Sequence, residues 1–259
     1  MNAECRLCQS QEELRNSHVL PEFLYESLYD EKHRFKAIHM DGSESPSSRL
    51  EQKGYRERLL CQKCETKLSR LEGYASKNYF VAPDRVNLGM AGLERPYGFE
   101  YRGLEYETMK LFQLSLLWRI SVATIKPFSG VSVGQEHEER LRNILLTENA
   151  PAVEAYPCFI SEDPAIPRGE LWGSPLTHTE SSNGTQIVTI FVDNQFWQFE
   201  VAERANTSGP GASIAKTWLA PDGIIMGYWR NLKETPFYEQ LAQEQSQWSD
   251  EFKAKLGLP

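Results

Sequence analysis

The chain has 259 residues, of which 28 are Lys or Arg and 36 are Asp or Glu, giving a net charge of −8. Its aromatic share of 11 % and charged share of 25 % exclude a disordered or collagen-like chain. No apolar run approaches the ~20 residues that cross a bilayer, and the first residues form no apolar signal segment. We therefore expect a cytoplasmic protein without a membrane partner.

The first predicted segment, residues 1–90, contains four of the five cysteines as two Cys-x-x-Cys pairs. Four thiolates in a reducing compartment predict a structural Zn²⁺ site formed by Cys5, Cys8, Cys61 and Cys64. Residues 40–58, between the pairs, are rich in Gly, Ser and polar side chains and predict irregular structure. Leu59 and Leu60 predict a short strand entering the second pair, and the spacing of later residues predicts a helix after it, through Thr66, Leu68, Leu71 and Tyr74.

The second predicted segment, residues 91–150, is helical. Apolar residues recur there at helical spacing and predict a core-facing stripe, formed by Met109, Phe112, Leu116, Ile120 and Ala123. A second helix is predicted for "QEHEERLRNILL" after Gly134, with acidic residues in its first turn, where the helix dipole favours them.

The third predicted segment, residues 151–259, is rich in strands. Thr185–Val192 and Phe196–Val201 predict a hairpin around residues 193–194, "GIIMGYWR" predicts another strand, and "TPFYEQLAQEQSQWSDEFKAKL" predicts an amphipathic helix. Cys158 and most of the tryptophans are interpreted as core residues. The predicted class is therefore α+β, with a zinc-stapled module, a helical middle and a strand-rich C-terminal part.

Two short motifs carry a resemblance to a known family. The sequences "SHVLP" at residues 17–21 and "LLCQKCE" at residues 59–65 resemble the HNH endonucleases. The resemblance covers roughly residues 5–75 and implies a ββα-metal module stapled by a treble-clef zinc finger. The helical middle, "LFQLSLLWRISVATI", resembles the corresponding part of bacterial HNH-like proteins of uncharacterised role.

The resemblance implies specific roles. His18 falls on the histidine that serves as general base, and Glu65 falls on a position that binds the catalytic ion, Mg²⁺ or Mn²⁺. Two positions depart from the pattern, because Ser17 stands at the first ligand position and Arg56 at the middle asparagine. Two alternatives stay open: His18 as a packed residue, and Glu65 as an acid that only suits the helix dipole. Glu72 is interpreted as a supporting or solvated carboxylate.

The charge distribution limits where nucleic acid could bind. Residues 1–90 hold 14 basic and 14 acidic residues, which leaves 14 basic and 22 acidic residues, the whole net −8, to residues 91–259. Since phosphate binding depends on cations, contact with nucleic acid requires a local patch. The candidates are His33, Arg34, Lys36, His39, Arg56, Arg58, Lys63, Lys67 and Arg70. We interpret His137 as part of a solvated helix face.

The leading functional hypothesis is a metal-dependent HNH-type endonuclease that cleaves phosphodiester bonds, with DNA preferred over RNA as the partner and bacterial defence as a setting. The alternative is a non-catalytic zinc-finger module that binds nucleic acid or a protein. A third hypothesis is that residues 151–259 sense a ligand or a regulatory protein partner and control the zinc-stapled module of residues 1–90, which we call the front module. Homo-oligomerisation is left open.

Overall fold

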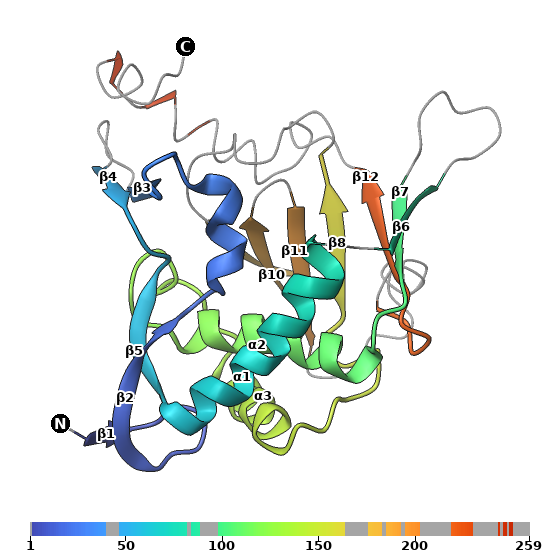
Figure 1. Cartoon of the computed structure of the whole chain (residues 1–259), viewed down its shortest axis with the longest axis horizontal. Helices are drawn as coiled ribbons and strands as arrows, with labels where there is room; N and C mark the ends of the chain where they lie inside the picture. The colour runs from blue at the N-terminus through green and yellow to red at the C-terminus, as the bar shows by residue number, and fades with distance from the viewer. Residues whose placement is uncertain are drawn as a thin grey trace.

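The computed structural model describes most of the chain and shows the α+β class that the sequence predicts (Figure 1). The described residues are 2–39, 47–81, 84–88, 98–163, 176–182, 185–192, 195–202, 219–229, 243, 246, 247, 249 and 250. Residues 193–194, two of the tryptophans (Trp172 and Trp218) and the predicted C-terminal helix lie outside this set, apart from isolated positions of that helix.

The front of the chain forms a ββα unit. Strands β1 (Asn2–Glu4), β2 (Gln11–His18) and β5 (Arg56–Cys61) form an antiparallel sheet in the order β1-β2-β5. The strand predicted before Cys61 is confirmed as β5, and it runs directly into helix α1 (Gln62–Ala75), which is also confirmed. The two elements therefore share a boundary at the second cysteine pair.

An insert lies between β2 and β5. It contains a 3₁₀ helix η1 (Glu22–Leu28) and the antiparallel pair β3 (Phe35–His39) and β4 (Ser47–Glu51). The expectation of irregular structure throughout residues 40–58 is wrong for β4 and for the start of β5 at residues 56–58. Pairing with β3 supplies backbone hydrogen bonds that the local composition does not indicate.

Three helices and a π-helical turn fill the middle of the molecule. Helix α1 continues into η2 (Ser76–Val81), and α2 (Tyr106–Val122) and α3 (Gln135–Thr147) follow as predicted. None of the described helices is long and apolar enough to span a membrane.

Helix α2 is buried on all sides, not only along the predicted stripe. Every residue from Met109 to Ser121 is buried, including the polar Lys110, Gln113 and Arg119. In Figure 1 helix α2 lies near the centre of the molecule, beside α1 and α3 and in front of the large sheet. The stripe prediction was therefore correct in position but too narrow, because helices and a sheet cover the other faces.

Within the described parts of the chain, the large sheet has seven strands in the order β6-β7-β12-β8-β11-β10-β9. Its pairings are antiparallel except for β12 with β8. The predicted hairpin is confirmed, with Thr185 opposite Ala202 and Val192 opposite Gln195. The strands are β6 (Asp84–Leu88), β7 (Gly98–Arg102), β8 (Cys158–Glu162), β9 (Leu176–Ser182), β10 (Thr185–Val192), β11 (Gln195–Ala202) and β12 (Ile225–Trp229).

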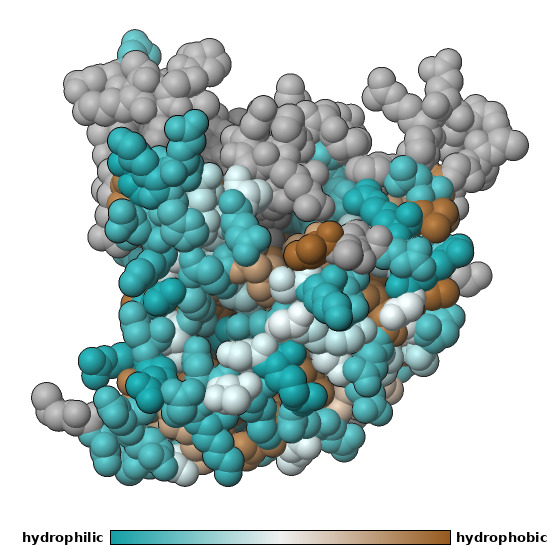
Figure 2. Space-filling model, viewed as in Figure 1, coloured by the Kyte–Doolittle hydropathy of each residue, from teal (hydrophilic) through white to brown (hydrophobic). Residues whose placement is uncertain are grey.

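This sheet connects the predicted segments through one hydrophobic core. Strand β6 lies within residues 1–90, yet it pairs with β7 in the same sheet as β8–β12. Trp197 and Cys158 are buried as predicted, whereas the side chain of Trp229 lies outside the described residues. Large hydrophobic side chains are exposed at few described positions, and hydrophilic residues cover most of the face in Figure 2.

Arg119 joins three elements from inside α2. Its Nη1 donates to Glu72 of α1 at 2.6 Å and to the backbone carbonyl of His18 at 3.1 Å. The residue is only 2 % exposed. A buried guanidinium with two such partners fixes the end of β2 against both helices.

We predict that Arg119→Met lowers the free energy of unfolding by roughly 3 kcal/mol, because it leaves a carboxylate and a buried carbonyl unpaired. Arg140→Met is the control, since its pair with Glu136 is solvent-exposed and should contribute about 0.5 kcal/mol or less. Urea denaturation measures the free energy of unfolding of both variants. Equal losses of this free energy in the two variants would contradict the role given to Arg119.

Candidate functional site

Four cysteine sulfurs form a cluster at the front of the molecule. The Sγ atoms of Cys5, Cys8, Cys61 and Cys64 all lie within 4.8 Å of one another. Cys8 Sγ is 3.8 Å from Cys61 Sγ, which matches the separation of about 3.8 Å between two sulfurs that each lie ~2.3 Å from a tetrahedral zinc ion. The cluster fits the predicted structural Zn²⁺ site.

The cluster draws its sulfurs from both ends of the ββα unit. Cys5 and Cys8 lie in the turn between β1 and β2, Cys61 ends β5, and Cys64 lies in the first turn of α1. The backbone N–H of Cys61 donates to Cys5 Sγ at 3.3 Å. This is a treble-clef arrangement, in which a knuckle, a strand pair and the start of a helix bring four sulfurs together.

The environment of the sulfurs favours a shared cation. Burial raises the pKa of Cys5, and burial together with the neighbouring sulfurs raises the pKa of Cys64. Burial also raises the pKa of Cys8, but hydrogen bonds with Ser10, Cys5 and Cys64 outweigh it and lower the value to about 6. Since zinc binds deprotonated sulfur, a divalent ion offsets the repulsion among four adjacent thiolates.

Ser17 and Glu65 meet between the strand pair and α1. Ser17 Oγ donates to Glu65 Oε2 at 2.6 Å across 48 residues of sequence. Ser17 is fully buried, and Glu65 follows Cys64 in the first turn of α1. The structure thus brings together the two positions that the resemblance connects with a catalytic ion. Both offer oxygen, the donor that Mg²⁺ and Mn²⁺ prefer.

His18 faces a different group of residues. It ends β2 opposite Arg56 of β5, and Arg56 Nε lies 2.8 Å from His18 Nε2. The same ring nitrogen contacts the carboxylate of Glu22. Because adjacent strand residues alternate in direction, Ser17 reaches α1 while His18 reaches η1. No hydrogen bond or ion pair joins His18 to Glu65 among the described residues.

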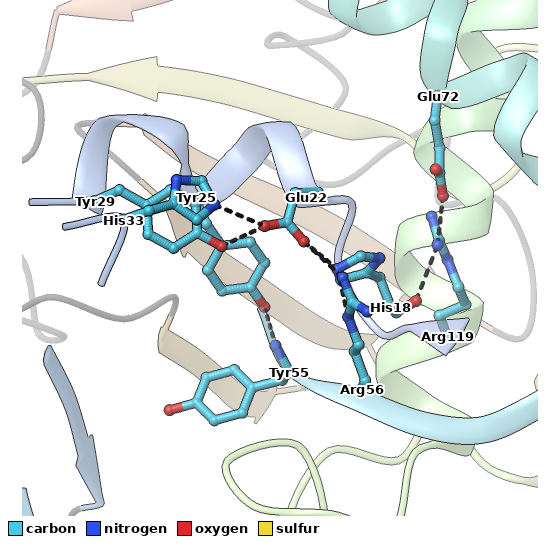
Figure 3. A network of polar contacts seen from close by, with 9 residues as sticks. All are labelled: His18, Glu22, Tyr25, Tyr29, His33, Tyr55, Arg56, Glu72 and Arg119. Atoms are coloured by element: carbon cyan, nitrogen blue, oxygen red, sulfur yellow. Dashed lines mark hydrogen bonds and ion pairs between the residues drawn. The ribbon is translucent and has the colours of Figure 1, made fainter. Parts of the chain in front are cut away.

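Glu22 is the centre of this second group (Figure 3). Its carboxylate contacts His18, accepts a hydrogen bond from the hydroxyl of Tyr29 and pairs with Arg56 Nη2 at 3.2 Å. His33 Nε2 lies 3.8 Å away. The sequence does not predict the roles of Glu22 and Tyr29, because Glu22 meets Arg56 only in the folded chain, across 34 residues of sequence.

The environment of this group shifts the pKa values of both His18 and Glu22. Burial and the adjacent Arg56 lower the pKa of His18 below 6.5, although Glu22 opposes them. Burial raises the pKa of Glu22, but Tyr29, His18 and Arg56 outweigh it and lower the value below 4.5. At neutral pH, His18 is therefore uncharged and Glu22 is ionised.

Glu72 has a different role from Glu65. Its carboxylate pairs with the buried Arg119 at 2.6 Å. This pairing connects α1 to α2 and, through Arg119, to the backbone of His18. Glu72 therefore supports the structure around the site.

Most of the candidate basic surface is internally paired. The paired residues are Arg34 with Asp30, Arg56 with Glu22, and Lys67 and Arg70 with Glu148. Arg58 and Lys63 are exposed and have no ion pair within the described parts of the chain. The side chains of Lys36 and His39 lie outside the description. His137, interpreted as part of a solvated face, is 2.9 Å from the Tyr156 hydroxyl.

We predict one zinc ion per purified chain and loss of that zinc in Cys61→Ser, with a large fall in the melting temperature of the front module. Zinc binding worth about 10–16 kcal/mol is coupled to folding in small fingers, so a missing ligand unfolds them. Cys158→Ser is the control, because Cys158 is buried far along the chain and outside the cluster. Metal analysis of both variants checks this. Stoichiometric zinc in Cys61→Ser would contradict the assignment.

Comparisons with known proteins return no match: no protein-family model, no curated protein and no solved structure is similar to this chain.

Proposed function

We propose that the front module is a metal-dependent HNH-type endonuclease that cleaves phosphodiester bonds in nucleic acid. The observation that carries the proposal is the hydrogen bond of 2.6 Å between Ser17 Oγ and Glu65 Oε2. It joins two positions that the HNH resemblance assigns to ion binding, at the junction of a strand pair and a helix. The cysteine cluster lies at the start of the same helix.

Glu65 is the residue that would hold the catalytic ion. Mg²⁺ in phosphoryl-transfer sites is bound by one or two carboxylates, with waters and substrate phosphates completing the shell, so a single carboxylate suffices as an anchor. Glu65 Oε1 has no partner among the described residues, which leaves it available. The ion would neutralise charge on the scissile phosphate and the leaving oxygen.

His18 would accept the proton of the attacking water. In the tautomer whose Nε2–H donates to the Glu22 carboxylate, the lone pair of Nδ1, which has no hydrogen-bond partner within the described structure, is free to take the proton. The lowered pKa of His18 keeps the ring neutral at physiological pH, as a base requires. The side chain is 20 % exposed, so water can reach it.

The substrate and setting extend the proposal. DNA is the preferred substrate and bacterial defence the setting, both on the HNH resemblance alone. A cytoplasmic location suits four reduced zinc-binding thiols. Residues 151–259 would sense a ligand or partner protein, and a molecule that binds there should change the cleavage rate of the whole chain.

A non-catalytic module that binds nucleic acid is the second candidate. Three observations favour it. Ser17 is neutral and buried, and the guanidinium of Arg56 lies against His18. Glu65, bound by Ser17, and His18 lie on opposite sides of β2. In this alternative, the same surface binds phosphate without hydrolysis. Binding of DNA without cleavage under any divalent metal would support it over the nuclease.

We predict that His18→Ala abolishes most cleavage, at least a hundredfold, while keeping one zinc per chain. The wild-type rate should fall as the pH drops below a midpoint lower than 6.5, because protonation removes the base. Plasmid, single-stranded DNA and RNA with Mg²⁺ or Mn²⁺ are the substrates. His137→Ala, on α3, is the control.

Two results would contradict this role. Full cleavage by His18→Ala would exclude the histidine as the base. Loss of zinc in His18→Ala would make His18 a structural residue.

We predict that Glu65→Gln weakens Mn²⁺ binding at least tenfold and lowers cleavage in parallel, because the amide is a poor ligand for a hard cation. The change keeps the side-chain shape and an acceptor for Ser17. Glu107→Gln is the matched control, since Glu107 is an exposed acid in the first turn of α2. Equal Mn²⁺ affinity in the two variants, measured by electron paramagnetic resonance, would exclude Glu65 as the ligand.

A further inference from the structure

We propose that His18, Tyr29, His33 and Arg56 form a binding site for a phosphate group and that the carboxylate of Glu22 occupies this site in the resting protein. We call these four residues the donor cluster. The inference rests on the proposed function only in identifying the anion as a phosphodiester. Glu22 would then be a built-in competitor that the substrate displaces.

The donor cluster converges on one carboxylate from separate parts of the chain. His18 ends β2, Arg56 begins β5, and Tyr29 and His33 lie in the segment between η1 and β3 (Figure 3). Arg56 Nη2 lies 3.2 Å from Glu22 Oε2, while Tyr29 contacts the other oxygen, Oε1. Both oxygens are therefore bound by donors from different elements, as a phosphate would be.

Tyr29 and His33 are held in place by local structure. Their rings stack with centroids 3.9 Å apart, and the backbone N–H of His33 donates to the carbonyl of Asp30 at 2.8 Å. Burial and Glu22 raise the pKa of Tyr29, so its hydroxyl keeps its proton and remains a donor. This half of the donor cluster is preorganised for an anion.

The chemistry favours an anion over a metal ion. Two histidines and a glutamate could ligate a cation, but the guanidinium of Arg56 is 2.8 Å from His18 Nε2. A divalent cation placed between His18 and Glu22 would be repelled by this fixed positive charge. An oxyanion would instead gain the charge-assisted hydrogen bonds that Glu22 now accepts.

The site can exchange its occupant with solvent. The side chain of Glu22 is 34 % exposed and that of Arg56 is 27 % exposed. Glu22 lies in the first turn of a short 3₁₀ helix, so a rotation of its side chain releases the donors without moving β2 or β5. Arg56 Nη1, which has no partner in the described residues, adds a further donor for the incoming group.

The test is the affinity for inorganic phosphate, measured by isothermal titration calorimetry without added divalent metal. Glu22→Gln removes the competing charge but keeps the shape, and it should bind phosphate roughly tenfold more tightly than the wild type. Glu26→Gln, an exposed acid in the same helix, should not change the affinity.

Two double variants test which arginine the gain in phosphate affinity depends on. Arg56→Ala in the Glu22→Gln background should abolish the gain in phosphate affinity. Arg15→Ala in the same background should leave most of it, because Arg15 is an exposed arginine on β2 outside the candidate basic surface. An unchanged affinity in Glu22→Gln, or a gain that survives Arg56→Ala, would overturn the inference.

The wild-type protein gives a second measurement that does not depend on the variant folding. Phosphate titrated into it should shift the ring resonances of His18, Tyr29 and His33 in NMR spectra. Shifts confined to other residues would overturn the inference. Phosphate binding at the donor cluster without nucleic-acid cleavage would contradict the nuclease proposal alone, so the two proposals fail separately.

Discussion

Four cysteine sulfurs impose the constraint on which the front of the molecule depends. Cys8 and Cys61 are 53 residues apart in sequence, yet their sulfurs are 3.8 Å apart. A zinc ion there would tie the turn before β2 to the end of β5 and the start of α1. Since Glu65 follows directly on Cys64, the same ion would fix where its carboxylate meets Ser17. The position of the candidate site would then depend on metal-coupled folding.

The candidate site has two halves on opposite sides of β2. Ser17 faces Glu65 on the helix side, while His18 faces Glu22 and Arg56 on the side of the insert. Arg119 holds the strand end between them through the carbonyl of His18. Hydrolysis needs both halves to act on one phosphodiester, whereas binding needs only the second. The two candidate functions therefore differ in whether the half of the site that contains Glu65 is needed.

The sequence predicts those features that depend on local patterns. The spacing within each Cys-x-x-Cys pair predicts the metal ligands, and the residues around 193–194 predict the strands of the hairpin, because each of these patterns lies within a few residues. Features that depend on a packing partner rather than on the local pattern were not predictable: β4 is stabilised by β3, and α2 is buried on all sides by tertiary neighbours. The role of Glu22 was hidden for the same reason, since its partner Arg56 is 34 residues away.

The central claim is that one ion staples the fold while a second is held by Glu65 at its contact with Ser17. Anomalous diffraction from crystals grown with Zn²⁺ and Mn²⁺, collected at the absorption edge of each metal, tests it most directly. The account predicts a zinc peak among the four cysteine sulfurs and a manganese peak beside the Glu65 carboxylate. Zinc elsewhere, or no manganese at Glu65 at saturating concentration, would contradict it.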